Sequence, residues 1–380
     1  MKALKYIVFS IGAIILIWVA WVQIDLSDQP EPSLELGSEI YFQDFPFDSA
    51  EGYIIGIQPI MATADFATEE NYFTKLDNYL SEANKKNWLK ENTIVLFPEY
   101  IGTWLVVANQ RNSINQSNSI STAMIKLIAS KPFQFLKYWS KAQAENKVNE
   151  AIFSMEAEKM AGIYQRTFSK LAVKYKVSIV AGSIVLPNPS VENEILKISK
   201  APLQNISAWF YPDGKIDNDL IRKVFPIQEE LRFTQAGNLT EIPVFETAIG
   251  NVASVICADS WYPEIYKTLK EKQVDILLVP SYSSPNEMWN RPWNGYNGSA
   301  IPNDVNQSDI GQLTEQEAWE KYSMLGRSQS ANIAYGINTF LHGKLWDMTA
   351  AGDVFVIQDY EKTRIPSRNS SMIVRIAIKK

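Results

Sequence analysis

The sequence predicts an α/β protein, in which a sheet of apolar strands is covered by helices on at least one face. Two observations lead to this fold class. Short apolar runs rich in β-branched residues recur along the chain, and the segments between them show the apolar spacing of amphipathic helices. Apolar residues make up 46% of the 380-residue chain and charged residues 21%, the balance of a globular protein with a sizeable core.

The chain opens with an apolar segment at residues 6–24, "YIVFSIGAIILIWVAWVQI", which contains no charged side chain. A helix of this length rises roughly 28 Å, enough to cross the hydrocarbon core of a bilayer. Lys2 and Lys5 precede the segment and acidic residues follow it, so the positive-inside bias places the remainder of the protein on the extracytoplasmic side of the membrane. We therefore expect residues 1–25 to be a single-pass transmembrane signal anchor, with a cleaved signal peptide as the main alternative.

A linker and the first strands and helix of the sheet come next. Residues 26–50 are rich in proline, serine and acids, and we expect them to be a linker that lifts the domain off the membrane. The apolar run "GYIIGIQPI" at 52–60 predicts a buried strand, and "NTIVLFPEY" at 92–100 predicts a second one. Between them, the spacing of apolar side chains in 68–84 predicts a helix.

Helix and strand signals continue to alternate towards the C-terminus. Helices are predicted at about 143–175 and 263–273. Strands are predicted, in chain order, at 178–186, 206–216, 250–259, 274–281, 332–340 and 353–360.

Two stretches do not fit this alternation. Residues 105–142 read as polar with short helical pieces, and residues 283–325 carry Trp289, Trp293 and Trp319 among Asn, Pro and Gly. Long loops in a compact domain are functional lids or disordered inserts, and the tryptophans favour a lid or pocket wall. We therefore expect one domain at 51–380, with insertions near these two stretches.

Composition excludes several classes of function. The net charge of -6 leaves the protein as a whole without a basic footprint for nucleic acid. One cysteine, Cys257, cannot close an intramolecular disulfide, and one histidine, His342, cannot build a multi-histidine zinc site. The common phosphate, dinucleotide, zinc-protease and serine-hydrolase motifs do not occur in the sequence, and we predict neither a metal nor a cofactor.

Three potentially reactive side chains stand at predicted strand ends. Glu99 ends "TIVLFPE", Lys223 follows a strand in "LIRKVFP", and Cys257 ends "NVASVIC" before a predicted helix. Reacting groups of open α/β sheets gather beyond the carboxyl ends of the strands. A carboxylate, an ammonium and a thiol suffice for acyl transfer without histidine, because the thiol needs a base and the oxyanion needs a donor. Taken singly, each residue also has an ordinary structural explanation.

The segments around these residues resemble the three signature segments of the carbon-nitrogen hydrolase (nitrilase) superfamily. They are "LFPEY", "IRKVFP" with acids close behind, and "VICADSWYPE", and the intervening strands "AGSIVLP", "NISAWFYPDGKI" and "VDILLVPS" follow the family's order. The resemblance covers residues 51–380. It implies a four-layer αββα sandwich and a Glu-Lys-Cys triad. In this chain we expect the sandwich to be preceded by the one N-terminal transmembrane helix predicted above.

The resemblance also implies a role for each residue. Glu99 would be the general base, and Cys257 the nucleophile that forms a thioester. Lys223 would stabilise the oxyanion, assisted by the backbone N–H of Ala258 at the start of the following helix. A second glutamate often lies just past the family's lysine. Glu229 and Glu230 compete for this position, and we favour Glu230.

Further residues were assigned to the surroundings of the triad. Trp104, Trp261 and Tyr262 are candidates for substrate-binding pocket walls, with core packing as the alternative. Asp259 is expected to orient the turn that carries Cys257, and His342 to be a structural histidine.

Together these features predict a membrane-tethered, extracytoplasmic amidase-type hydrolase that cuts a non-peptide C–N bond. Its substrate would be a small-molecule or lipid-like amide. The alternatives are an N-acyltransferase that passes the acyl group to an amine on a lipid or lipoprotein, a nitrilase, and a catalytically silent binding protein. A homo-oligomer is possible, because sandwich domains of this family commonly pair.

Overall fold

The computed structural model describes residues 29–35 and 37–379, together with isolated positions between residues 6 and 20. The transmembrane segment expected at 1–25 therefore lies largely outside the described residues. Within the described part of the chain, no helix combines the length and the apolar character needed to cross a membrane. The anchor stays a prediction from the sequence.

Two large sheets form the centre of the molecule. The first has seven strands, in the order β1 (Tyr41–Phe45), β18 (Met372–Ile378), β2 (Gly52–Gln58), β4 (Thr93–Leu96), β5 (Ser178–Pro187), β8 (Leu203–Phe210) and β9 (Ile221–Arg222). The second has six strands, in the order β10 (Phe245–Thr247), β11 (Gly250–Ser254), β12 (Ile276–Ser281), β13 (Tyr335–Phe340), β16 (Val354–Gln358) and β17 (Glu361–Ile365). Both sheets mix parallel and antiparallel pairs.

Smaller elements complete the described structure. Two minor sheets contain β15 (Met348–Ala350), β14 (His342–Leu345) and β3 (Ile60–Ala62), and β6 (Ser190–Glu192) with β7 (Ile195–Lys197). The α-helices are α2 (Glu69–Lys85), α3 (Asn112–Asn115), α4 (Ile120–Ser130), α5 (Pro132–Trp139), α6 (Lys147–Tyr175), α7 (Gln228–Leu231), α8 (Pro263–Glu271), α9 (Glu315–Tyr322) and α10 (Met324–Arg327).

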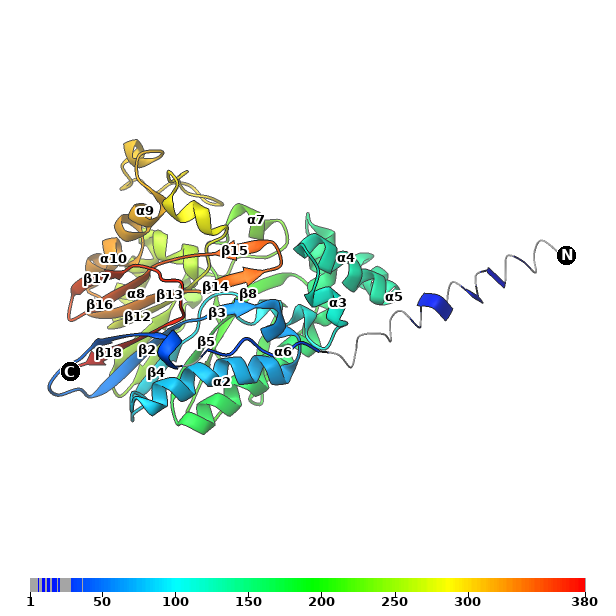
Figure 1. The fold of residues 1–380 in the computed structure, drawn as a ribbon. Helices are drawn as coiled ribbons and strands as arrows, with labels where there is room; N and C mark the ends of the chain where they lie inside the picture. The colour runs from blue at the N-terminus through cyan, green and yellow to red at the C-terminus, as the bar shows by residue number, and fades with distance from the viewer. Residues whose placement is uncertain are drawn as a thin grey trace.

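The layers run helix, sheet, sheet, helix. Helices α2 and α6 cover the outer face of the first sheet, and α8 and α10 lie over the second sheet (Figure 1). Neighbouring residues of one strand serve different layers: Ile55 of β2 joins the core under α2 and α6, whereas Ile54 joins the core shared with the second sheet. Both are fully buried. This two-sided burial explains why the central strands read as continuous apolar runs rather than as alternating patterns.

A glycine marks where the two sheets approach each other. A Cβ added to Gly56 of β2 would lie 2.3 Å from Cδ1 of Ile337 and 2.8 Å from Cγ2 of Thr339, both on β13 of the facing sheet. Such distances are far inside van der Waals contact. Close packing of the two sheets therefore depends on the missing side chain at this position.

The prediction of a linker at 26–50 is wrong for the second half of this segment, which is part of the folded domain. Strand β1 pairs in parallel with β18 at the edge of the first sheet. The side chain of Ser33 is hydrogen-bonded to Asp65, and Ile40 is buried in the core. Strand pairing and side-chain burial outweigh the linker-like composition, so the folded domain begins before residue 51.

The insertion at 105–142 is also less polar than its sequence indicated. It forms a short 3-10 turn, Thr103–Val107, followed by helices α3, α4 and α5. Apolar side chains of α4 and α5, such as Met124 and Phe135, pack against the main core. The serines and asparagines of this stretch serve partly as helix caps, as Ser119 does for α4.

Candidate active site

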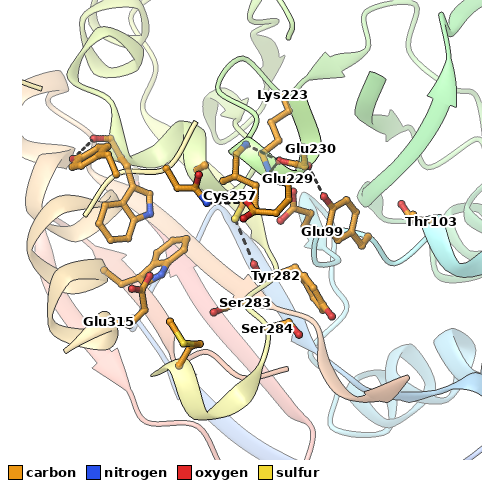
Figure 2. A pocket seen from close by; sticks show the side chains of 18 of the residues that line it. Glu99, Thr103, Lys223, Glu229, Glu230, Cys257, Tyr282, Ser283, Ser284 and Glu315 are labelled. Carbon is orange, nitrogen blue, oxygen red and sulfur yellow. Dashed lines mark hydrogen bonds and ion pairs between the residues drawn. The ribbon is translucent and has the colours of Figure 1, made fainter. Parts of the chain in front are cut away.

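The three predicted catalytic side chains meet where the two sheets face each other. Glu99 follows β4 and Lys223 follows β9, both in the first sheet. Cys257 lies three residues beyond the end of β11, in the second sheet, and begins the 3-10 turn Cys257–Trp261. Figure 2 shows the carboxylate, the ammonium and the sulfur turned towards one another.

A buried ion-pair cluster holds two of these groups together. The Nζ atom of Lys223 lies 2.8 Å from Oε1 of Glu99 and 2.6 Å from Oε2 of Glu230. The Nδ2 group of Asn205 donates to Oε1 of Glu99 at 2.9 Å and to Oε1 of Glu230 at 3.0 Å. The hydroxyl of Tyr100 donates a further hydrogen bond to Glu230. Buried charges are stable only when paired and hydrogen-bonded in this way.

Burial and neighbouring charges shift the pKa values of these three side chains in different directions. Burial raises the pKa of Glu99 above its ordinary value, although Lys223 acts in the opposite sense. For Glu230, burial is outweighed by Lys223 and by hydrogen bonds from Tyr100 and the backbone, and the pKa is lowered. The pKa of Lys223 stays well above its ordinary value, because the two carboxylates overcome the effect of its burial. The more basic of the two carboxylates is thus Glu99.

Cys257 occupies a constrained position beside Glu99. Its φ of 52° lies in the left-handed region, which aims the side chain away from the path of the strand. The thiol donates a hydrogen bond to the carbonyl oxygen of Tyr282, which lies 3.7 Å from Sγ. Burial and the neighbouring carboxylate raise the pKa of the thiol well above its ordinary value. The resting thiol is therefore neutral, with its hydrogen bond to the carbonyl of Tyr282 and with Glu99 as a neighbouring carboxylate.

Asp259 connects the turn of Cys257 to the segment of Lys223. Its Oδ1 atom accepts the backbone N–H groups of Val224 at 2.9 Å and Phe225 at 2.7 Å. Its Oδ2 atom accepts the N–H of Ile256 at 3.0 Å. The carboxylate thereby fixes two segments from different sheets, which agrees with the orienting role expected for it.

The expectation for Ala258 needs a correction. This residue lies in a 3-10 turn, and the α-helix that follows, α8, begins only at Pro263. A single 3-10 turn has no substantial macrodipole, so the helix-dipole argument for an oxyanion site at Ala258 does not apply. Ala258 nonetheless lines the same cavity as Cys257.

A largely apolar cavity of about 580 Å³ opens beside the triad. Trp104, Trp261 and Tyr262, predicted to be pocket walls, all line it. Trp293 and Trp319 from the predicted lid segment also line it, and the rings of Trp261 and Trp319 pack edge to face at 5.0 Å. The second insertion is thus an ordered aromatic wall of the cavity.

The remaining candidates do not join the ion-pair cluster, although Glu229 lines the cavity. Glu229 is exposed and accepts a hydrogen bond from Nδ2 of Asn297 at 2.9 Å. This geometry supports Glu230 as the second glutamate. The ring of His342 is buried, its Nε2 lies 2.8 Å from the carbonyl oxygen of Gly352, and burial lowers its pKa. These contacts support the structural role expected for His342.

Sequence reasoning missed three residues of the site. Asn205 lies inside β8 and touches both glutamates, yet nothing in "LQNISAWF" distinguishes it from an ordinary strand residue. Tyr100 follows the catalytic glutamate directly, and its φ of 61° was not foreseeable. Glu315 lines the cavity from the first turn of α9, where its acidic side chain reads as a helix-start residue.

The fold of the chain is similar to that of solved amidase structures. The fold resembles a double mutant of the amidase from Nesterenkonia sp. AN1 in complex with acrylamide, with a TM-score of 0.52, 10% identity and coverage of 88% of this chain and 94% of that one. A second structure of this amidase, with the acetamide moiety of fluoroacetamide added at the active-site cysteine, has a TM-score of 0.52 at 10% identity and covers 87% and 92%. The described part of the chain thus has an α/β nitrilase-like fold.

Comparison of sequences then gives the family. The carbon-nitrogen hydrolase family matches residues 55–296. The chain therefore belongs to the carbon-nitrogen hydrolase family, which confirms the resemblance inferred from its three segments.

Two individual relatives are similar over parts of their length. The probable hydrolase YhcX of Bacillus subtilis is 31% identical over 117 residues, which are 31% of this chain and 20% of that protein. The probable nitrilase C965.09 of Schizosaccharomyces pombe is 24% identical over 202 residues, which are 53% of this chain and 62% of that protein. The chain matches less than two thirds of the length of either relative.

Proposed function

We propose that this protein is an amidase-type hydrolase that cleaves the C–N bond of an amide through a thioester on Cys257. The observation that carries the proposal is the convergence of three groups on one cavity. Lys223 lies 2.8 Å from Glu99, Glu99 is near enough to the Cys257 thiol to help raise its pKa, and all three side chains line the cavity. Family membership supports the class of reaction.

In the first half-reaction the sulfur of Cys257 attacks the amide carbon. The S–H proton passes to Glu99, an S–C bond forms, and the carbonyl oxygen becomes an oxyanion that the Lys223 ammonium stabilises. The C–N bond then breaks as Glu99 returns the proton to the leaving nitrogen. A raised pKa suits Glu99 to this exchange, because proton transfer is most efficient for a group whose pKa lies near the working pH.

In the second half-reaction water attacks the thioester. Glu99 takes one proton from the water, a C–O bond forms, and the C–S bond breaks to release a carboxylic acid. The thiolate of Cys257 is reprotonated by Glu99, which restores the starting state. Glu230 stays ionised throughout, because its lowered pKa reflects fixed contacts with Lys223 and Tyr100. It acts as a positioning residue for the ammonium.

The lining and volume of the cavity favour an amide substrate that carries a bulky apolar group. Aromatic rings of Trp104, Trp261 and Trp293 supply much of its wall. The volume of about 580 Å³ is in the range of pockets that enclose drug-sized molecules. A small aliphatic amide would leave most of this apolar surface in contact with water. We therefore infer an arylalkyl or long-chain amide as the substrate class.

The test is turnover of 4-phenylbutanamide by the full chain and by two variants. Cys257→Ala and Cys257→Ser are expected to lose activity by roughly 10⁴-fold or more, as nucleophile removal does in other acyl-transfer enzymes. Intact-protein mass spectrometry after treatment with fluoroacetamide should show one adduct on the wild type and none on Cys257→Ala. Full ammonia release by Cys257→Ala would end the proposal.

The same assay separates the alternative chemistries. Added glycine ethyl ester diverts the acyl group into a new amide if an amine is the true acceptor, whereas a hydrolase yields the free acid. 4-Phenylbutanenitrile in place of the amide tests nitrilase activity. The extracytoplasmic location and the single-pass anchor stay predictions, and a protease-protection assay on intact cells decides them.

A further inference from the structure

Helices α4 and α5 form a lobe at one end of the sandwich, away from α8 and α9 (Figure 1). Four large apolar side chains of this lobe are exposed, and we call them the α4–α5 face. They are Ile125 at 66%, Phe133 at 79%, Leu136 at 53% and Trp139 at 43% of full exposure. None of the side chains of α5 is fully buried. A cluster of this kind marks an interaction site in a soluble domain.

The opposite side of the lobe is apolar as well. Met124 and Ile128 of α4, and Phe135 and Tyr138 of α5, pack against the main core. The lobe is thereby fixed to the body of the protein, and Nε2 of Gln134 adds a hydrogen bond to the carbonyl of Met155 on α6 at 2.9 Å. Helices that are apolar on both sides belong to a large core or to a membrane environment. The outward side requires an apolar partner.

The basic residues around the α4–α5 face indicate what kind of apolar partner this face contacts. Residues 101–144 contain five basic and no acidic residues, whereas the whole chain has a net charge of -6. Lys126 and Lys131 are held by the protein itself, through the carbonyl of Ser113 at 2.7 Å and the carboxylate of Glu156 at 2.6 Å. Lys137 and Lys141 are exposed beside the apolar face. Basic residues around exposed aromatic and aliphatic side chains are typical of contact with anionic lipid.

We propose that the α4–α5 face docks on the surface of an anionic bilayer. Phe133, Leu136 and Trp139 enter the boundary between headgroups and acyl chains, and Lys137 and Lys141 contact lipid phosphates. A second copy of the chain is a poorer occupant, because a symmetric dimer would bring two basic faces together. The indole of Trp18 donates to the carbonyl of Ala129 on α4 at 2.8 Å, so this side chain contacts the same lobe.

The single cysteine makes a site-specific test possible. In a Cys257→Ala background of the full chain, new cysteines replace Leu136 on the face or Ile195, which is 47% exposed on β7 and serves as the matched control. Each is labelled with the environment-sensitive fluorophore NBD. Vesicles of phosphatidylglycerol and phosphatidylcholine should shift the emission at position 136 to shorter wavelength and leave position 195 unchanged. The readout needs no turnover, so it stands apart from the proposed reaction.

The label distinguishes docking from any other mode of vesicle binding. If the protein binds vesicles through its N-terminal segment alone, the label at 136 stays in water, and the proposal is overturned. Equal shifts at 136 and 195 overturn it too, as does a shift that grows with protein concentration in the absence of lipid. Hydrogen exchange of the unmodified chain provides a second measurement, in which vesicles should slow exchange within 120–141.

The lysines give the proposal a quantitative test. Lys137→Gln with Lys141→Gln should weaken docking on anionic vesicles by about 30-fold at low salt, because each cation near a charged bilayer contributes about a factor of five. The control is Lys197→Gln with Lys200→Gln, two exposed lysines on and beside β7. Loss of docking from the control pair, or none from the first pair, contradicts the assignment.

Discussion

At the scale of single residues, the centre of the site is an ammonium between two carboxylates. Lys223, Glu99 and Glu230 are each at most 2% exposed. Burial raises the pKa of Glu99 despite Lys223, whereas at Glu230 burial is outweighed by Lys223 and by hydrogen bonds from Tyr100 and the backbone N–H of Ile227. One cluster thus supplies both a fixed negative charge and a base.

Removing the ammonium should destabilise the fold in a pH-dependent way. Lys223→Met leaves two carboxylates buried without a cation, and we expect the free energy of unfolding at pH 7 to fall by about 3–5 kcal/mol. The loss should shrink as the pH falls, since protonation relieves the repulsion. Urea denaturation at pH 7 and pH 5 measures this. A pH-independent loss would mean that packing, not charge, accounts for the effect, and Lys223→Met with Glu230→Gln should recover part of the stability.

Glu315 gives a second pH-dependent prediction. Burial raises the pKa of this carboxyl to about 7. The folded protein thus binds the proton more tightly than the unfolded chain, and the contribution of Glu315 to stability is complete only below its ordinary pKa. The free energy of unfolding should therefore decrease as the pH rises towards 7. Glu315→Gln should flatten this part of the stability curve in urea titrations, whereas Glu287→Gln, an exposed acid of the same insertion, should leave it unchanged.

The sequence alone was enough to predict the role of a residue when the segment around that residue is recognisable. Glu99, Lys223 and Cys257 each follow an apolar strand in a recognisable segment. Asn205 could not be predicted, because its contacts with both glutamates arise from the antiparallel pairing of β8 with β9 and from the folding back of α7. Its role exists only in three dimensions.

At the scale of elements, strands were easier to predict than insertions. The central strands are buried on both faces and therefore keep an unmistakable apolar run, as in β12. The segment 105–142 has a polar sequence because serines and asparagines, some of which cap short helices, dilute its apolar side chains. The second insertion, for which the sequence predicts a lid or a pocket wall, contributes Trp293 and Trp319 to the cavity, whereas Trp289 packs behind Trp319.

Two glycines should respond in opposite directions to the same substitution. Gly56→Ala places a methyl group 2.3 Å from Ile337 between the sheets and should lower the free energy of unfolding by about 1–3 kcal/mol. Gly162 lies inside α6, and the nearest atom to an added Cβ is Nη1 at the end of the long Arg166 side chain, which pairs with Glu69 through its other nitrogens. Gly162→Ala should raise stability by about 0.5–1 kcal/mol through helix propensity. Thermal or urea unfolding of both variants checks the pair, and equal signs would contradict the packing described for the sheets.

At the scale of the whole molecule, charge and apolar surface are distributed unevenly. An acidic body carries one basic, apolar lobe, built from the acid-free stretch 101–144. The net charge averaged over the whole chain conceals this asymmetry. The overall negative charge argues against a nucleic-acid-binding surface, but it gives no sign of the local basic surface that could contact lipid. The four-layer arrangement itself was implied by the resemblance to a family, since strand signals alone do not reveal how many sheets form.

The position of β18 has a consequence for biosynthesis. This last strand lies between β1 and β2, with β1 in parallel register and β2 in antiparallel register. A nascent chain halted before Met372 has therefore translated every other strand of the first sheet but lacks the one that joins its two earliest segments. Until residues 372–378 have been translated and have left the ribosome, the edge of β2 that pairs with β18 stays open to chaperones and to other chains. Limited proteolysis of stalled nascent chains should reveal an abrupt gain of protection once residues 372–378 have emerged from the exit tunnel.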